Sequence, residues 1–205
     1  MWLLLQLADS ALPTGGFAHS AGLEAAVQQG EVPDLRAFLR ETAWQAGHAA
    51  LPLASAGHQD PALLEELDAR ADAFLVNHVA NRASRVQGRA FLETCARIFP
   101  ELTPLRGRAR HHAPVFGVAL RMLGVELRPM QQLLLSQSLR GACAAAVRLG
   151  VAGTHEAQRL QRELAPLLDE VLAACGPLRE PVQTAPLLDL LASTHDRLYS
   201  RLFQS

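Results

Sequence analysis

Hydrophobic residues recur every three or four positions along most of the chain, which is the spacing of an α-helix. From Leu64 to His78, apolar residues fall on one helical face, and charged residues fill the other. Asp60 and Pro61 come just before this segment and provide an N-cap and a first-turn proline. No stretch alternates with a period of two, so no strand is predicted. The pattern predicts an all-α fold.

Caps and prolines divide the rest of the sequence into further helices. Asp34 is expected to cap a helix that ends near Ala46. The other expected helices span residues 81–98 (continuous with the preceding helix or separated by a kink), 114–123, 129–149, 154–174 (with a kink allowed at Pro166), and 186 nearly to the C-terminus. The chain, residues 1–205, is therefore expected to form a single-domain helical bundle of about seven to ten helices.

Two segments have an unusual composition. Residues 141–147 consist of small residues, which let neighbouring backbones approach closely, so we expect this helix to lie at the centre of the bundle. Residues 99–113 contain prolines, a glycine and several arginines, and we expect a surface loop there.

Composition and charge narrow the function. A chain of 205 residues that is 49% hydrophobic and 19% charged can bury a sizeable core. The net charge of −1 argues against nucleic acid as the main partner, because binding phosphates needs a basic surface. All 19 basic residues are arginine, and lysine is absent. This excludes a phosphate-binding loop that ends in Gly-Lys and any Schiff-base chemistry.

The cysteines and the first residues indicate a cytoplasmic protein. Cys95, Cys143 and Cys175 form no C-x-x-C pair and are odd in number, so we expect small buried hydrophobes in a reducing compartment. The segment 1–9 has no positively charged start, and its apolar run ends at Asp9, unlike a signal peptide. No segment is long and apolar enough to span a membrane.

The sequence gives only weak support for a metal site or for a catalytic nucleophile. His111 and His112 are adjacent, so on a helix they point about 100° apart and cannot share a metal. No permanent metal or cofactor site is predicted.

The segment 18–22, Ala-His-Ser-Ala-Gly, resembles a nucleophile elbow, but that chemistry needs a turn between a buried strand and a helix. Without any parallel-sheet pattern, a serine hydrolase is rejected.

The segment 12–17, Leu-Pro-Thr-Gly-Gly-Phe, is the most unusual local feature. Glycine reaches positive φ without steric cost, so this sequence predicts a tight turn. The turn is either a plain connection between helices or a backbone surface that a partner approaches closely.

Arginines gather at two places. Arg82, Arg85 and Arg89 share one helical face, which is either solvated and internally paired or a docking site for an acidic partner. The C-terminal residues 197–205 combine arginine with apolar side chains, and we expect them to dock on the chain's own core or on a partner. Arg201 has no acid within four residues, so it is expected to find a carboxylate or backbone carbonyls elsewhere.

Several sequence blocks, in order, resemble the UreF family of urease accessory proteins. They are Leu5–Glu24 (LQLADSALPTGGFAHSAGLE), Arg82–Arg89 (RASRVQGR), His112–Gly117 (HAPVFG), Ala145–Gly150 (AAVRLG), Ala185–Asp189 (APLLD) and His195–Ser205 (HDRLYSRLFQS). Together they cover essentially the whole chain.

The resemblance implies an all-α homodimer that is not an enzyme. The family assembles with a second accessory protein, UreD (UreH in some species), and with the GTPase UreG. It links the two and modulates the GTPase while the complex delivers nickel to apo-urease. The resemblance implies that this chain holds no stably bound cofactor and that nickel is handled by the complex.

The residues expected to contact partners lie in the resembling blocks and in the arginine-bearing segments. They are Gly15, Gly16, Phe17, His19, Glu24, Arg82, Arg85, Arg89, Arg148, Tyr199, Arg201, Leu202 and Phe203.

The residues alone leave two other functions open. One is a small all-α enzyme that uses His and Arg near the Gly15–Gly16 turn, which a screen for hydrolase activity would reveal. The other is a helical adaptor unrelated to metal, whose deletion would leave urease activity unchanged.

Overall fold

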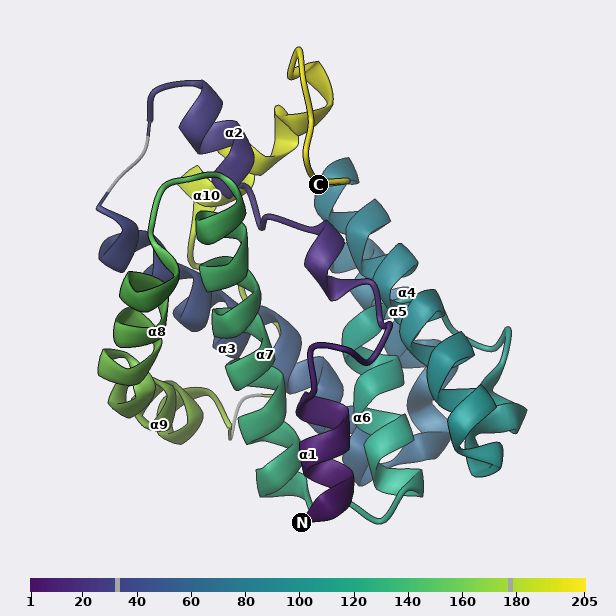
Figure 1. Ribbon diagram of the computed structural model, residues 1–205. Coiled ribbons are helices and arrows are strands. Elements are labelled where there is room, and N and C mark those ends of the chain that lie inside the picture. Colours follow the sequence, from purple (N-terminus) through teal and green to yellow (C-terminus); the bar gives the residue numbers. More distant parts are fainter. Residues whose placement is uncertain (32–33, 177–178) are drawn as a thin grey trace.

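The computed structural model describes residues 1–31, 34–176 and 179–205, and within them the regular structure is helical, with no strand (Figure 1). The α-helices found there are α1 (Trp2–Ala8), α2 (Leu23–Gln28), α3 (Leu35–Gln59), α4 (Leu64–Phe74), α5 (His78–Ile98), α6 (His112–Met122), α7 (Leu127–Arg148), α8 (Thr154–Glu163), α9 (Ala165–Cys175) and α10 (Pro186–Ser193). Short 3₁₀ turns are η1 (Gly16–Ala18), η2 (Pro61–Leu63), η3 (Pro100–Leu105) and η4 (His195–Arg197). The predicted all-α fold is confirmed.

Helix α3 lies at the centre, with α4, α6, α7 and α9 packed around it (Figure 1). Helix α6 approaches it so closely that a Cβ on Gly117 would clash with the carbonyl oxygen of Ala54. The small residues of α7, including Ala145 and Ala146, are buried, but they lie beside the central helix. The prediction that α7 is the central helix is therefore wrong, because α3, which packs against α4, α6, α7 and α9, takes that place.

The end expected for the first long helix, near Ala46, is wrong. Helix α3 continues to Gln59 and contains Pro52. Gly47 is not a helix stop, because a Cβ there would clash with the side chain of Val171 in α9. Eleven residues of α3 are buried, and this packing outweighs the hydrogen bond lost at proline.

Two of the expected helices are divided. Asn77 separates α4 from α5, and its side-chain oxygen accepts from the backbone N–H of Val79 (3.0 Å) and Ala80 (3.4 Å). This confirms the kinked alternative. The expected helix 154–174 breaks at Leu164, and Pro166 then lies in the first turn of α9, where its missing N–H costs nothing.

Two expectations about irregular segments are wrong. Residues 99–113 are not simply a surface loop, because residues 100–105 form η3, α6 begins at His112, and the side chains of Leu102, Leu105 and His111 are buried. The last helix does not run nearly to the C-terminus, since α10 ends at Ser193 and residues after η4 are extended or bent. Their backbone donors bind a side chain of α2 instead of a helical carbonyl, as described below.

The three cysteines are buried and free, as predicted. Burial raises the pKa of the Cys95 thiol to about 12 and that of Cys143 to about 11, so neither is a reactive thiolate. Within the described ranges, no helix is both long and apolar enough to cross a membrane.

Candidate functional site

The end of the chain folds back over its beginning. Residues 194–205, which we call the C-terminal strap, lie against α2 and the turn before it (Figure 1). The backbone N–H of Gln204 donates to the Ala18 carbonyl (2.7 Å), and that of Ser20 donates to the Ser205 carbonyl (2.6 Å). The two outermost blocks of the sequence thus form one structural unit.

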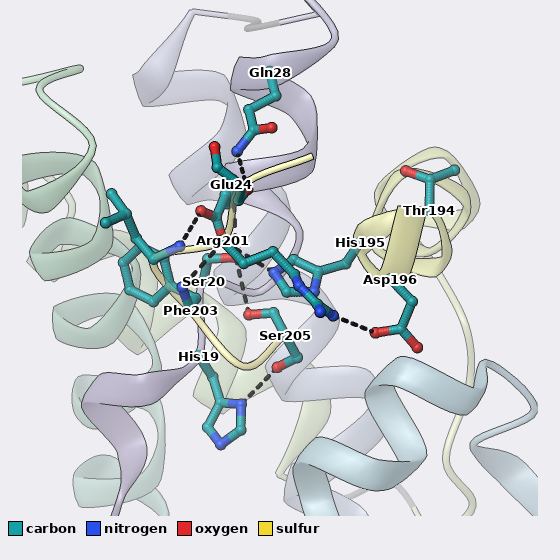
Figure 2. Close-up of polar contacts among 12 residues, drawn as sticks. His19, Ser20, Glu24, Gln28, Thr194, His195, Asp196, Arg201, Phe203 and Ser205 are labelled. Carbon is teal, nitrogen blue, oxygen red and sulfur yellow. Dashed lines mark hydrogen bonds and ion pairs between the residues drawn. The ribbon is translucent and has the colours of Figure 1, made fainter. Parts of the chain in front are cut away.

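Glu24 is the anchor of this unit (Figure 2). Its side chain is fully buried, and its Oε1 accepts from the backbone N–H of Leu202 at 2.6 Å. Its Oε2 lies 2.9 Å from Nε2 of the fully buried His195 and accepts from the Phe203 N–H at 3.2 Å. A buried carboxylate is tolerated when donors surround it, so the strap and Glu24 stabilise each other.

Local backbone geometry places Glu24 there. Gly22, which precedes α2, has φ +86°, and a Cβ on it would lie 3.1 Å from the Ala192 Cβ. Only glycine combines this backbone conformation with so close an approach to α10. Gly15 has φ +76°, which confirms the tight turn predicted before Phe17.

His19 lies beneath the strap in a partly buried setting. His19 Nδ1 lies 2.6 Å from the Ser205 hydroxyl, and burial, aided by the nearby charges of His195 and Arg82, lowers its pKa to about 4. Among the residues that the structure describes, His19 Nε2 and His195 Nδ1 are buried and find no hydrogen-bond partner. In the described part of the chain, no three metal-ligating side chains gather, so these nitrogens do not form a metal cluster.

Ser20, the residue at the centre of the elbow-like sequence, has a structural role. Its hydroxyl donates to the Ser205 carbonyl (3.0 Å) and accepts from the Glu24 N–H (3.4 Å). Its neighbour His19 pairs with Ser205 instead, so the serine lacks the hydrogen-bonded base that a nucleophile needs.

Arg148, at the end of α7, ties the turn to the strap. Its guanidinium donates to the Phe17 carbonyl and to the Leu202 carbonyl (3.2 Å), and it lies 4.1 Å from the centre of the Phe203 ring. Phe203 is buried, whereas the side chains of Phe17 and Leu202 are 70% and 62% exposed. Tyr199 is completely exposed. We call Phe17, Tyr199 and Leu202 the apolar rim.

Asp196 joins the strap to α5. Arg82 binds its carboxylate with two hydrogen bonds (2.6 and 2.9 Å), His78 Nε2 lies 3.2 Å away, and Arg201 lies 3.4 Å away. Of the two expected kinds of partner for Arg201, a carboxylate or backbone carbonyls elsewhere, it finds a carboxylate, that of Asp196 five residues back along the chain. A groove of about 550 Å³ opens here, and its lining includes His19, Arg82, Arg201 and Phe203.

The structure brings most of the predicted site residues together. Arg148 reaches the unit of turn, α2 and strap from the end of α7. The predicted site residues within that unit are Gly15, Gly16, Phe17, His19, Glu24, Tyr199, Arg201, Leu202 and Phe203. Glu24 is internal and supports the surface without forming it, whereas Phe203 is mostly buried but contributes to the lining of the groove. Arg82, Arg85 and Arg89 lie beside this unit on α5.

The sequence analysis missed His195, Asp196 and Ser205 as individual site residues. Their only signal was membership of the terminal block, because their partners Glu24, Arg82 and His19 lie more than 100 residues away along the chain.

The chain is similar to proteins of one family. The model of the UreF family matches residues 30–165. A protein from Arabidopsis thaliana named urease accessory protein F is 35% identical, with 100% of this chain and 92% of the relative covered. A rice (Oryza sativa subsp. indica) protein of the same name is 34% identical over 99% of this chain and 84% of its own length. Urease accessory protein UreF of Mycobacterium sp. (strain JLS) is 35% identical, with coverage of 98% and 97%.

The matches to these relatives extend over nearly the whole chain, including the first and last sequence blocks that form the site. The family model matches the helical region between those two blocks. The chain therefore belongs to the UreF family of urease accessory proteins.

Proposed function

We propose that this chain is a non-enzymatic scaffold in urease maturation, which links a UreD/UreH-type accessory protein to a UreG-type GTPase and modulates that GTPase. In this proposal it acts in the cytoplasm as a homodimer and works on apo-urease. Nickel is handled by the assembled complex, and the chain holds no stably bound cofactor. The proposal draws on the family, whose curated members are named accessory proteins.

The observation that best supports a scaffold is the apolar rim. Exposed apolar side chains that gather on one surface are typical of protein–protein contact sites. The backbone carbonyls of Phe17 and Leu202 both accept from the guanidinium of Arg148. The strap is also fixed by the buried hydrogen bond from the Leu202 N–H to Glu24. An ordered apolar surface of this kind loses little conformational entropy on binding.

Reconstitution tests the proposal. We would mix the purified chain with the UreD/UreH-type and UreG-type proteins encoded in the same genome and read the stoichiometry by light scattering after size exclusion. The test variant is Y199A/L202D, which alters two exposed rim residues and leaves Phe203 and the strap backbone in place. The matched control is W2A/L5D, whose positions are also exposed and lie on α1, at the opposite end of the molecule (Figure 1).

We expect the wild type and the control to assemble and support urease activation, and Y199A/L202D to bind a partner at least tenfold more weakly while staying folded. A wild-type chain that binds neither partner would refute the proposal. Hydrolase activity that is lost with His19→Ala would favour the enzyme alternative, and unchanged urease activity after deletion would favour an adaptor unrelated to metal.

A further inference from the structure

A second groove lies on the side of α5 that carries the three arginines. It has a volume of about 390 Å³ and is lined by Leu75, Val76, His78, Asn81, Arg82, Arg85 and Arg89. Its lining thus combines an apolar end, at the break between α4 and α5, with a row of guanidiniums along the helix.

The groove has more positive than negative charge. Arg85 pairs with Asp72, and Arg82 pairs with Asp196. Asp72 also accepts from Asn81 (2.9 Å) and lies 3.2 Å from His111, while Asp196 is shared with His78 and Arg201. Both carboxylates are therefore already surrounded by donors.

Arg89 extends this row without a carboxylate of its own. Within the ranges that the structure describes, its only hydrogen bond runs from Nε to the Arg85 carbonyl at 3.3 Å, and it forms no ion pair. The donors on its two terminal nitrogens are left for a partner. Hydrogen bonds from Arg82 lower the pKa of Asp196 to about 2, and hydrogen bonds from Arg85 and Asn81 lower the pKa of Asp72 below its usual range, so both carboxylates are already committed to these donors.

Spacing indicates what would fit. Arg82, Arg85 and Arg89 are separated by three and four residues, so they lie on one helical face and span about 10 Å. Carboxylates with the same spacing on a second helix span the same length. Val76 is 85% exposed at the apolar end of the groove, and such a side chain is suited to packing against a partner's apolar residue.

We propose that this groove docks an acidic amphipathic helix of a partner protein, which presents carboxylates to Arg89 and the neighbouring arginines and an apolar side chain to Val76. This inference rests on the scaffold function proposed above, and it names the chemistry of one partner contact that is separate from the apolar rim.

The test variant is V76D/R89E. Both side chains are exposed, and neither supports another part of the described structure through an ion pair. The matched control is R121E/M122D at the end of α6, which makes the same change in charge with the same kinds of side chain. Far-ultraviolet circular dichroism and thermal unfolding would verify that both variants fold.

Two assays measure docking. In the first, fluorescence anisotropy follows a labelled 20-residue helical peptide with three glutamates spaced by three and four residues beside a leucine, against the same peptide with glutamine. In the second, the reconstituted complex of the wild type, the test variant and the control is titrated with each partner protein.

We expect the wild type to bind the glutamate peptide at least tenfold more tightly than the glutamine peptide, with weaker binding at 300 mM than at 50 mM salt. V76D/R89E should weaken peptide and partner binding at least tenfold, and the control should match the wild type. Equal binding of both peptides, or equal binding by wild type and V76D/R89E, would overturn the inference. Tighter binding of an RNA oligonucleotide than of the glutamate peptide would overturn it as well.

The two proposals fail separately. If the wild type and V76D/R89E assemble equally well with the partner proteins, the groove is not a docking site and the scaffold function stands. If the wild type binds the glutamate peptide but assembles with neither partner, the groove stands and the scaffold function fails.

Discussion

Replacing Glu24 by glutamine isolates the anchor of the C-terminal strap. The change keeps the size and shape of the side chain and replaces one acceptor oxygen by an NH₂ donor. Three donors currently meet the carboxylate, from His195, Leu202 and Phe203. His195 can adapt by moving its proton to Nδ1, which is unpartnered, so that Nε2 accepts. The two backbone N–H groups cannot adapt.

The magnitude follows from these contacts. With either orientation of the amide, its NH₂ group faces at least one backbone N–H, so one buried donor loses its acceptor. The remaining bonds also lose their charge assistance, since the acceptor is now neutral. A buried unsatisfied donor costs about 1–3 kcal/mol, so we expect E24Q to lower the free energy of unfolding by about 2–3 kcal/mol. E24A should cost about 3–5 kcal/mol, because it also leaves a cavity.

The assay has a global and a local part. Urea unfolding followed by circular dichroism gives the free energy of unfolding, and limited trypsin digestion follows cleavage after Arg197 and Arg201 in the strap. The control is E31Q, which makes the same chemical change at an exposed position. We expect strap cleavage to accelerate in E24Q and to stay unchanged in E31Q. E24Q stability within about 0.5 kcal/mol of wild type, with unchanged cleavage, would refute the assignment of Glu24 as the anchor.

Two further predictions concern the core. Burial lowers the folded-state pKa of both His19 and His112 to about 4, so the unfolded chain binds more protons below pH 6.5. The free energy of unfolding should therefore fall by about 2–4 kcal/mol between pH 7 and pH 5, the two histidines contributing about equally. Urea unfolding at both pH values measures this, and pH-independent stability would contradict it. Gly117→Ala should destabilise by more than about 3 kcal/mol, because the added Cβ meets the rigid carbonyl of Ala54, whereas Gly141→Ala, in an open part of α7, should stabilise by up to about 1 kcal/mol. Thermal unfolding of the pair tests this, and equal effects would show that α6 can move away from α3.

Sequence rules predicted a helix boundary correctly where a residue within one turn, such as a cap or a proline, itself determines that boundary. Asp34 caps α3 as predicted, with its side chain accepting from the Arg36 N–H, and the kink allowed at Pro166 falls at a real helix boundary, because capping and the missing proline N–H act within one turn. The end expected near Ala46 was wrong because α3 continues through Gly47, and a glycine that ends a helix and a glycine that admits a neighbouring helix look alike in sequence. Only the position of Val171, far along the chain, distinguishes the two.

Rules about neighbouring residues could not predict the contacts between Glu24 and the C-terminal strap. Glu24 lies in the first turn of α2, where a glutamate is ordinary because it faces the positive end of the helix dipole. Its complete burial depends on donors that lie more than 170 residues later, in a segment where apolar content alone predicted docking and could not say where. The helix expected there does not form, since the strap backbone finds its acceptors on Glu24.

Arg82 connects the two surfaces of the proposed scaffold. It contributes to the lining of both grooves and holds the strap through Asp196. A substitution at Arg82 would therefore disturb the apolar rim and the acidic docking groove together, and its effect on assembly could not be assigned to either. Tyr199 and Arg89 do not share this ambiguity, because neither forms an ion pair within the described residues and each belongs to one surface only. If both proposals hold, the effects of Y199A/L202D and V76D/R89E on the binding free energy of one partner should add when that partner touches both surfaces, whereas each variant should affect a different partner when the surfaces serve separate proteins.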